Sequence, residues 1–221
     1  MKKIVIMLAL VTTMVFSCKQ DSKSGMDFIE AERLESVKNR DKSKKSTSNV
    51  SKSIYTKYVY ANSKGENIVI QNSFPKGGMK YKDLKGNEYV YAVFWTRIIN
   101  KNTNPVELKI NFPPNSYEIQ DLPGKYYKIL IPSDIMTLDK IPLFNYGLKD
   151  LDSFFDNNID KSSLLKRTIK PKESNGFYVV ILRLIGGDKY GVLRTELSLK
   201  GQNLFYKIRD KEIQCGSIEI K

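Results

Sequence analysis

Residues 88–99, EYVYAVFWTRII, constrain the fold more than any other stretch of this chain. If they are extended, Tyr91 and Trp95 lie on one face while Ala92 and Phe94 lie on the other, so both faces are apolar. A run of this kind is typical of a central strand that is covered on both sides. Residues 177–185, FYVVILRLI, have the same character. Two such strands require a sheet whose two faces are both covered by other packed elements of the protein.

Several further segments have the alternation of half-buried strands. Residues 106–112, VELKINF, place Val106, Leu108, Ile110 and Phe112 on one side, and the Asn-rich 100–105 predicts a hairpin with 88–99. GGDKYG, 186–191, is expected to be a hairpin turn leading into 192–199. The other predicted strands are 54–61, 67–74, 204–208 and 213–220, and 148–158 is a predicted amphipathic helix. The fold is therefore expected to be mostly β, an antiparallel β-sandwich, immunoglobulin-like or related, with a short helical insertion.

The chain before this β-rich region divides into two parts. Residues 19–52 are dense in Lys, Ser, Asp and Glu and poor in large apolar groups, a composition that cannot offset the entropy of ordering. We expect 18–52 to be a flexible tether, although 26–38 could form a short helix that is too polar to be stable alone. Residues 53–221 are expected to be a single domain, and 1–17 a signal peptide. This signal has a positive start and an apolar core from Ile4 to Phe16 that is too short to span a bilayer permanently.

The end of the apolar core, Val15-Phe16-Ser17-Cys18, resembles the lipobox of bacterial lipoproteins. The resemblance implies cleavage between Ser17 and Cys18, a diacylglyceryl group on the Cys18 sulfur and further acylation of the new amine. Phe16 departs from the smaller residue that is common in this motif. Lys19 after the cysteine implies, by family analogy, an outer-membrane destination, without fixing the leaflet. The alternative is an ordinary secreted protein in which Cys18 lies near the cleavage site by chance.

The composition limits the chemistry that this chain can perform. There is no histidine, which removes His-based triads and imidazole metal sites. Cys215, the second of two cysteines, has no partner once Cys18 carries lipid, and it is expected to be a buried structural residue. Asp156, Asn158, Asp160 and Ser162 alternate as in a calcium loop, but Lys161 and Arg167 replace the glycine and the closing glutamate, so they are only weak candidates. No catalytic residue, metal or cofactor is predicted.

Charge and aromatic residues indicate the kind of partner. The net charge of +13 favours anionic surfaces such as lipid phosphates or acidic glycans, although scattered lysines can also reflect composition alone. Nucleic acid is not expected as a partner in the envelope. Most aromatic residues fall in strand patterns, whereas Tyr117, Tyr126, Tyr127 and Tyr146 lie in less regular stretches and are expected to be more exposed.

The sequence favours a non-enzymatic function. We expect a membrane-anchored envelope lipoprotein that binds or helps to assemble an envelope protein or glycan. One alternative is an envelope glycan hydrolase that uses two carboxylates, with Asp150, Asp152 and Asp156 as candidates. Another alternative is a subunit of a secretion or transport complex.

Overall fold

The computed structural model describes residues 29–33, 50–61, 65, 67–119, 122–185, 193–209 and 211–221. The predicted signal peptide, Ser17, Cys18 and the GGDKYG segment lie outside these ranges.

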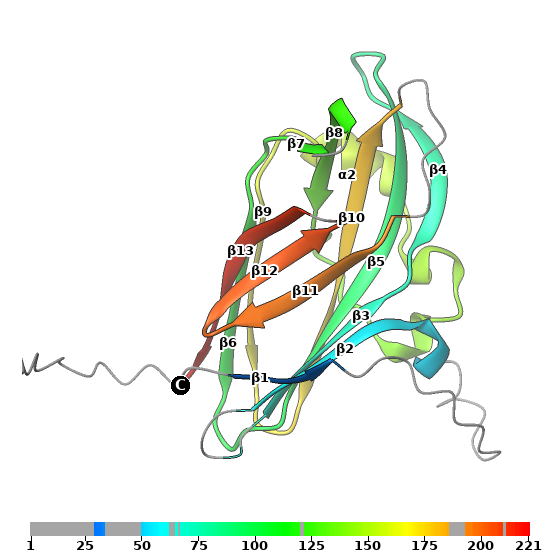
Figure 1. Cartoon of the computed structure of the whole chain (residues 1–221). Helices are drawn as coiled ribbons and strands as arrows, with labels where there is room; N and C mark the ends of the chain where they lie inside the picture. Colours follow the sequence, from blue (N-terminus) through cyan, green and yellow to red (C-terminus); the bar gives the residue numbers. More distant parts are fainter. Residues whose placement is uncertain are drawn as a thin grey trace, which may run out of the picture.

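The fold is an antiparallel β-sandwich, as predicted (Figure 1). The larger sheet, sheet A, has eight strands in the order β1-β2-β3-β5-β10-β8-β7, with β4 also paired to β5. The smaller sheet, sheet B, has five strands in the order β11-β12-β13-β6-β9. The two sheets together contain thirteen described strands, more than the seven to nine of immunoglobulin domains. The fold is therefore a sandwich with a larger number of strands than the immunoglobulin fold. The bounds of sheet A are β1 Ile29–Arg33, β2 Ile54–Ala61, β3 Asn67–Ser73, β4 Lys76–Lys82, β5 Glu88–Asn100, β7 Tyr117–Ile119, β8 Leu122–Leu130 and β10 Ser174–Leu184; those of sheet B are β6 Val106–Phe112, β9 Ser163–Ile169, β11 Thr195–Lys200, β12 Asn203–Ile208 and β13 Lys211–Ile220.

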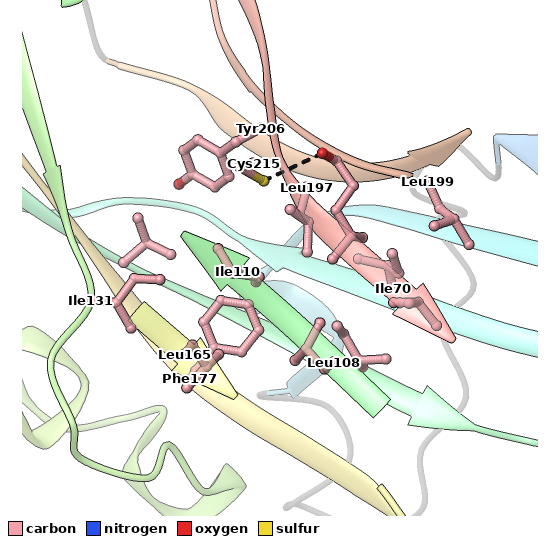
Figure 2. Close-up of a cluster of buried hydrophobic side chains, with 14 of the residues drawn as sticks. Ile70, Leu108, Ile110, Ile131, Leu165, Phe177, Leu197, Leu199, Tyr206 and Cys215 are labelled. Carbon is pink, nitrogen blue, oxygen red and sulfur yellow. Dashed lines mark hydrogen bonds between the residues drawn. The ribbon is translucent and has the colours of Figure 1, made fainter. Parts of the chain in front are cut away.

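The main core fills the space between the two sheets. Figure 2 shows part of it, where Leu108 and Ile110 of β6 face Phe177 of β10. The alternating residues of β6 that were predicted to point inward, from Val106 to Phe112, are all buried here. The alternation of β6 therefore correctly identified its buried face.

A second core covers the opposite face of sheet A, which explains the doubly apolar strands. It contains Trp95 of β5 and Tyr178 of β10, both fully buried. The cover is the segment 131–160, which holds the 3-10 helices η1 (Leu138–Lys140) and η2 (Phe144–Gly147) and the helix α2 (Leu151–Asn158). Leu151 and Phe155 of α2 are buried in this core, as the predicted apolar stripe requires. The prediction that both faces of β5 and β10 are covered is confirmed.

The predicted hairpin between residues 88–99 and 106–112 is wrong, because β5 belongs to sheet A and β6 to sheet B. Buried Asn100 fixes the corner between them. Its amide nitrogen donates to the carbonyl oxygens of Asn104 (2.8 Å) and Ile169 (3.0 Å), and its side-chain oxygen accepts from the Asn102 N–H at 2.9 Å. Asn100 thus supplies the partners that the backbone loses where it leaves sheet A.

The predicted hairpin turn at 186–191 is also wrong. β10 pairs with β5 and β8, whereas β11 pairs with β12, so the connection after β10 passes from sheet A to sheet B. β11 and β12 then form a hairpin from Thr195↔Ile208 to Lys200↔Asn203.

Side chains of sheet A close the edge of sheet B that β11 would otherwise leave open. Asn72 of β3 donates to the Leu197 carbonyl oxygen at 3.0 Å and accepts from the Leu197 N–H at 2.9 Å. The Tyr60 hydroxyl accepts from the Leu199 N–H at 3.0 Å, and the Tyr58 hydroxyl donates to the Glu196 carboxylate at 2.7 Å. These contacts replace a neighbouring strand along this edge.

The structure differs from the predicted tether at two places. Residues Ile29–Arg33 form β1, which pairs antiparallel with β2, so this stretch is neither coil nor the short helix considered above. Residues 50–53 are helical, and Val50 packs against the second core. The folded unit therefore begins before residue 53. Main-chain pairing can order a polar segment that its own composition would leave unfolded.

A network of ion pairs covers the outer face of sheet B. The Glu107 carboxylate lies 2.6 Å from the Lys221 ammonium and 3.1 Å from that of Lys166, with Lys109 at 3.8 Å. The hydrogen bonds from Lys221 and Lys166 lower the Glu107 pKa to about 2. Such a carboxylate stabilises the fold above its unfolded pKa near 4.5, and this contribution disappears as the pH falls through about 2.

We expect Glu107→Gln to destabilise the protein at pH 6 and to have much less effect at pH 2, because wild-type Glu107 is then becoming protonated as well. Urea unfolding at both pH values measures the difference. Glu88→Gln changes an exposed carboxylate on sheet A and serves as the control. Equal destabilisation by Glu107→Gln at the two pH values would show that the ion pairs do not contribute.

Candidate functional site

An exposed apolar patch lies on the segment that covers sheet A. We define the Phe144 patch as Ile135, Leu143 and Phe144, whose exposed fractions are 57%, 51% and 75%. Lys140 links them, because its ammonium donates to the Ile135 carbonyl oxygen at 2.8 Å and its carbonyl accepts from the Leu143 N–H at 3.0 Å. Apolar side chains that remain exposed together beside a packed core often mark an interaction site.

The turn that presents Phe144 has an unusual backbone. Asn145, Tyr146 and Gly147 follow one another with φ of 46°, 56° and 77°, in the left-handed region. A bulky residue such as Tyr146 adopts this conformation only when its surroundings hold it there. Left-handed residues at this point bring Tyr146 into the core while Phe144 stays at the surface.

Buried contacts of Tyr146 hold this turn in place. Its hydroxyl donates to the Phe74 carbonyl oxygen at 2.6 Å, and its own carbonyl accepts from the Tyr178 hydroxyl at 2.8 Å. Its ring meets Trp95 edge to face, with the centroids 6.4 Å apart. The patch therefore rests on a rigid support, so little conformational entropy is lost when a partner binds.

Lys76 of β4 lies directly beneath the patch. Its ammonium donates to the carbonyl oxygens of Ile141 (2.6 Å) and Leu143 (2.7 Å) and lies 4.3 Å from the centroid of the Tyr146 ring. Burial lowers the Lys76 pKa from its ordinary value. Charges of both signs surround the patch, because the exposed Asp134 and Asp139 lie on the same segment as Lys140.

The four tyrosines that were expected to be exposed divide into two groups. Tyr126 is 41% exposed and Tyr117 is half-buried, in agreement with the expectation. The expectation is wrong for Tyr127 and Tyr146, which are buried in the main and second cores respectively. Irregular sequence around Tyr146 reflected a packed turn and not a surface loop.

The structure does not bring the weak calcium candidates together as a metal group. Asp156 accepts from the Tyr81 hydroxyl at 2.7 Å, whereas the Asn158 amide donates to the Phe154 carbonyl oxygen of its own helix. Asp160 lies 2.8 Å from the Lys128 ammonium and 2.9 Å from that of Lys85, and their hydrogen bonds lower its pKa to about 2. Ser162 is exposed. Within the ranges that the structure describes, no three His, Cys, Asp or Glu side chains are grouped to hold a metal.

The three helix carboxylates considered for hydrolysis are exposed. Asp150, Asp152 and Asp156 all lie on the solvent side of α2. A general acid in a glycoside hydrolase needs a raised pKa, which burial usually provides. These positions do not have that environment.

Cys215 is buried, as predicted, and faces the main core (Figure 2). Its sulfur lies 3.5 Å from the Leu204 carbonyl oxygen. Leu204 pairs with Gly216 and the next residue, Phe205, pairs with Gln214, so Cys215 is the extra residue of a β-bulge. Burial raises the Cys215 pKa to about 12, which keeps the thiol protonated and unreactive at neutral pH.

Comparison with known proteins identifies no relative of this chain: no family model, no curated protein and no solved structure matches it. Among the described residues, no helix has the length and apolar character to cross a membrane. The Phe144 patch was missed by sequence reasoning. The signal that could have found it is PLFNYG, residues 142–147, where two apolar residues precede an Asn and a Gly that tolerate left-handed backbone.

Proposed function

We propose that this chain is a lipid-anchored protein of the bacterial envelope, most simply of the outer membrane, that binds a protein partner through the Phe144 patch. The resemblance of residues 15–18 to a lipobox supports the anchor, with acyl chains on Cys18. Each buried methylene contributes about 0.8 kcal/mol, so two or three chains hold a protein on the bilayer indefinitely.

The observation that carries the binding role is the 75% exposure of Phe144 on a buried and hydrogen-bonded turn. Aromatic side chains that are already fixed at a surface contribute strongly to protein interfaces. A glycan would use stacking on a flat aromatic face more than the aliphatic Ile135 and Leu143.

The anchor is tested by changing Cys18. We expect the wild-type protein to fractionate with membranes, and mass spectrometry of its mature amino terminus to show acyl chains on Cys18. Cys18→Ser is expected to move the protein to the soluble fraction or leave its signal peptide uncleaved. A wild-type mature protein without acyl chains would overturn this part of the proposal.

The partner surface is tested by site-specific photocrosslinking in cells. A photoreactive residue at position 144 and one at position 135 are expected to give the same discrete protein adduct, and Leu143→Asp is expected to abolish it without changing the thermal unfolding midpoint. The matched control is position 164, because Leu164 is 72% exposed but lies on β9 of sheet B. Equal crosslinking from position 164, or different adducts from 135 and 144, would show that the patch is not a specific site.

A further inference from the structure

The position of β1 determines which end of the domain faces the membrane, provided that Cys18 is lipidated as proposed. Ile29 is the first residue of β1 and pairs with Ala61, which in turn pairs with Asn67. The Asn67 carbonyl oxygen accepts from the Lys101 N–H at 2.9 Å. Ile29 therefore lies in one row with the corner between β5 and β6. This corner is at the lower end of the molecule in Figure 1.

The chain between the anchor and this row is short. Ten residues, 19–28, separate Cys18 from Ile29. Even fully extended they reach at most about 35 Å. With Cys18 lipidated as proposed, the end of sheet A that contains Ile29 and Lys101 thus stays within about 35 Å of the anchor.

Three lysines from two distant parts of the sequence lie at this same end. The Lys172 ammonium donates to the Lys101 carbonyl oxygen, and the Asn100 amide donates to the Lys170 carbonyl oxygen at 3.2 Å. Lys101, Lys170 and Lys172 are all exposed, and none of them forms an ion pair within the described part of the chain. The exposed Glu173 lies next to Lys172, so the three lysines and Glu173 together carry a net charge of +2.

We propose that Lys101, Lys170 and Lys172 form a docking surface for anionic phospholipid headgroups, which seats this end of the sandwich on the bilayer that holds the anchor. Exposed lysines near an anionic membrane are each attracted to its negative surface potential, and the attraction weakens with salt. The anchor keeps the domain at the surface, and the lysines select its orientation. Along β5, Trp95, which contacts the Tyr146 ring beneath the patch, lies six residues before Lys101, about 20 Å along the strand.

The test uses the mature chain, residues 18–221, with Cys18→Ser, so that any binding to vesicles is independent of the lipid. Co-sedimentation is measured with vesicles of phosphatidylcholine containing 30% phosphatidylglycerol and with phosphatidylcholine alone. We expect binding to the anionic vesicles only, reduced about tenfold or more by the triple variant Lys101→Glu, Lys170→Glu, Lys172→Glu. Lys101→Gln, Lys170→Gln, Lys172→Gln should reduce it less.

The matched control is the triple variant Lys80→Glu, Lys82→Glu, Lys149→Glu, which changes the net charge equally at exposed positions on β4 and before α2. It should retain most of the binding. Circular dichroism and the thermal midpoint confirm that each variant is folded. Equal loss in both triple variants would mean that total charge alone drives binding, and no loss in the first would mean that another surface is used; either result overturns the docking surface. Because lipidation is read separately by mass spectrometry, its failure is distinguishable from failure of this proposal.

Discussion

Asn72→Leu is expected to lower the free energy of unfolding by about 3–5 kcal/mol. Asn72 is 2% exposed and uses its full hydrogen-bonding capacity. Besides its two bonds to Leu197, its amide donates to the Thr56 hydroxyl and its oxygen accepts from that of Thr96, both at 3.0 Å. Leucine has a similar volume but leaves the Leu197 N–H and carbonyl without these partners inside the protein, and burying unpaired polar groups is costly.

Urea denaturation followed by circular dichroism measures this loss. Asn111→Leu makes the same change at an exposed position of β6 and should alter the unfolding free energy by less than about 0.5 kcal/mol. If Asn72→Leu cost no more than this control, the edge of β11 would not depend on the side chains of sheet A.

Gly216→Ala is expected to be at least as damaging, with a loss of about 4 kcal/mol or failure to fold. A Cβ atom at Gly216 would lie 1.9 Å from the Lys109 carbonyl oxygen and 3.0 Å from the Ile110 Cα. Both are backbone atoms of β6, held in register by the pairing of Gly216 with Ile110. The strand can relieve the overlap only by giving up its pairing with β6 at the centre of sheet B.

Expression yield, thermal unfolding and the near-ultraviolet circular dichroism spectrum report the outcome. Ser217→Ala, at the next position of β13, is the control and should be well tolerated. A Gly216→Ala protein with a wild-type unfolding midpoint would mean that β13 and β6 are further apart than the structure has them.

The strands of this protein could be predicted where side-chain alternation is strong. β2 and β6 have the predicted bounds. The apolar residues on both faces of β5 correctly indicated that both faces are covered. β4 was missed, since KGGMKYK contains two glycines and three lysines and has little strand propensity. Its pairing with β5 and the contacts of Tyr81 stabilise it in the fold.

Sheet membership could not be predicted from local sequence. The residues after β5 resemble a hairpin turn, but the chain changes sheet there. The corner is stabilised by the bond from Asn100 to Ile169, which is 69 positions away. Both candidate surfaces were also missed, because each depends on contacts between residues that are far apart in the sequence. Tyr146 is held by a carbonyl of Phe74, and Lys101 meets Lys172 only after the β9–β10 connection is brought to the β5–β6 corner.

β5 and β10 serve two cores at once, one on each face of sheet A, and this has a consequence for how the protein opens. Neither the covering segment nor sheet B can separate without exposing Trp95 or Phe94 on the shared strands to water. The backbone amides in the middle of β5 and β10 should therefore be the slowest in the molecule to exchange with deuterium, at rates that follow global unfolding. Substitution of Tyr146, which supports the Phe144 patch, should therefore accelerate exchange in the sandwich as well. The patch and the two sheets are expected to lose their structure in one cooperative transition.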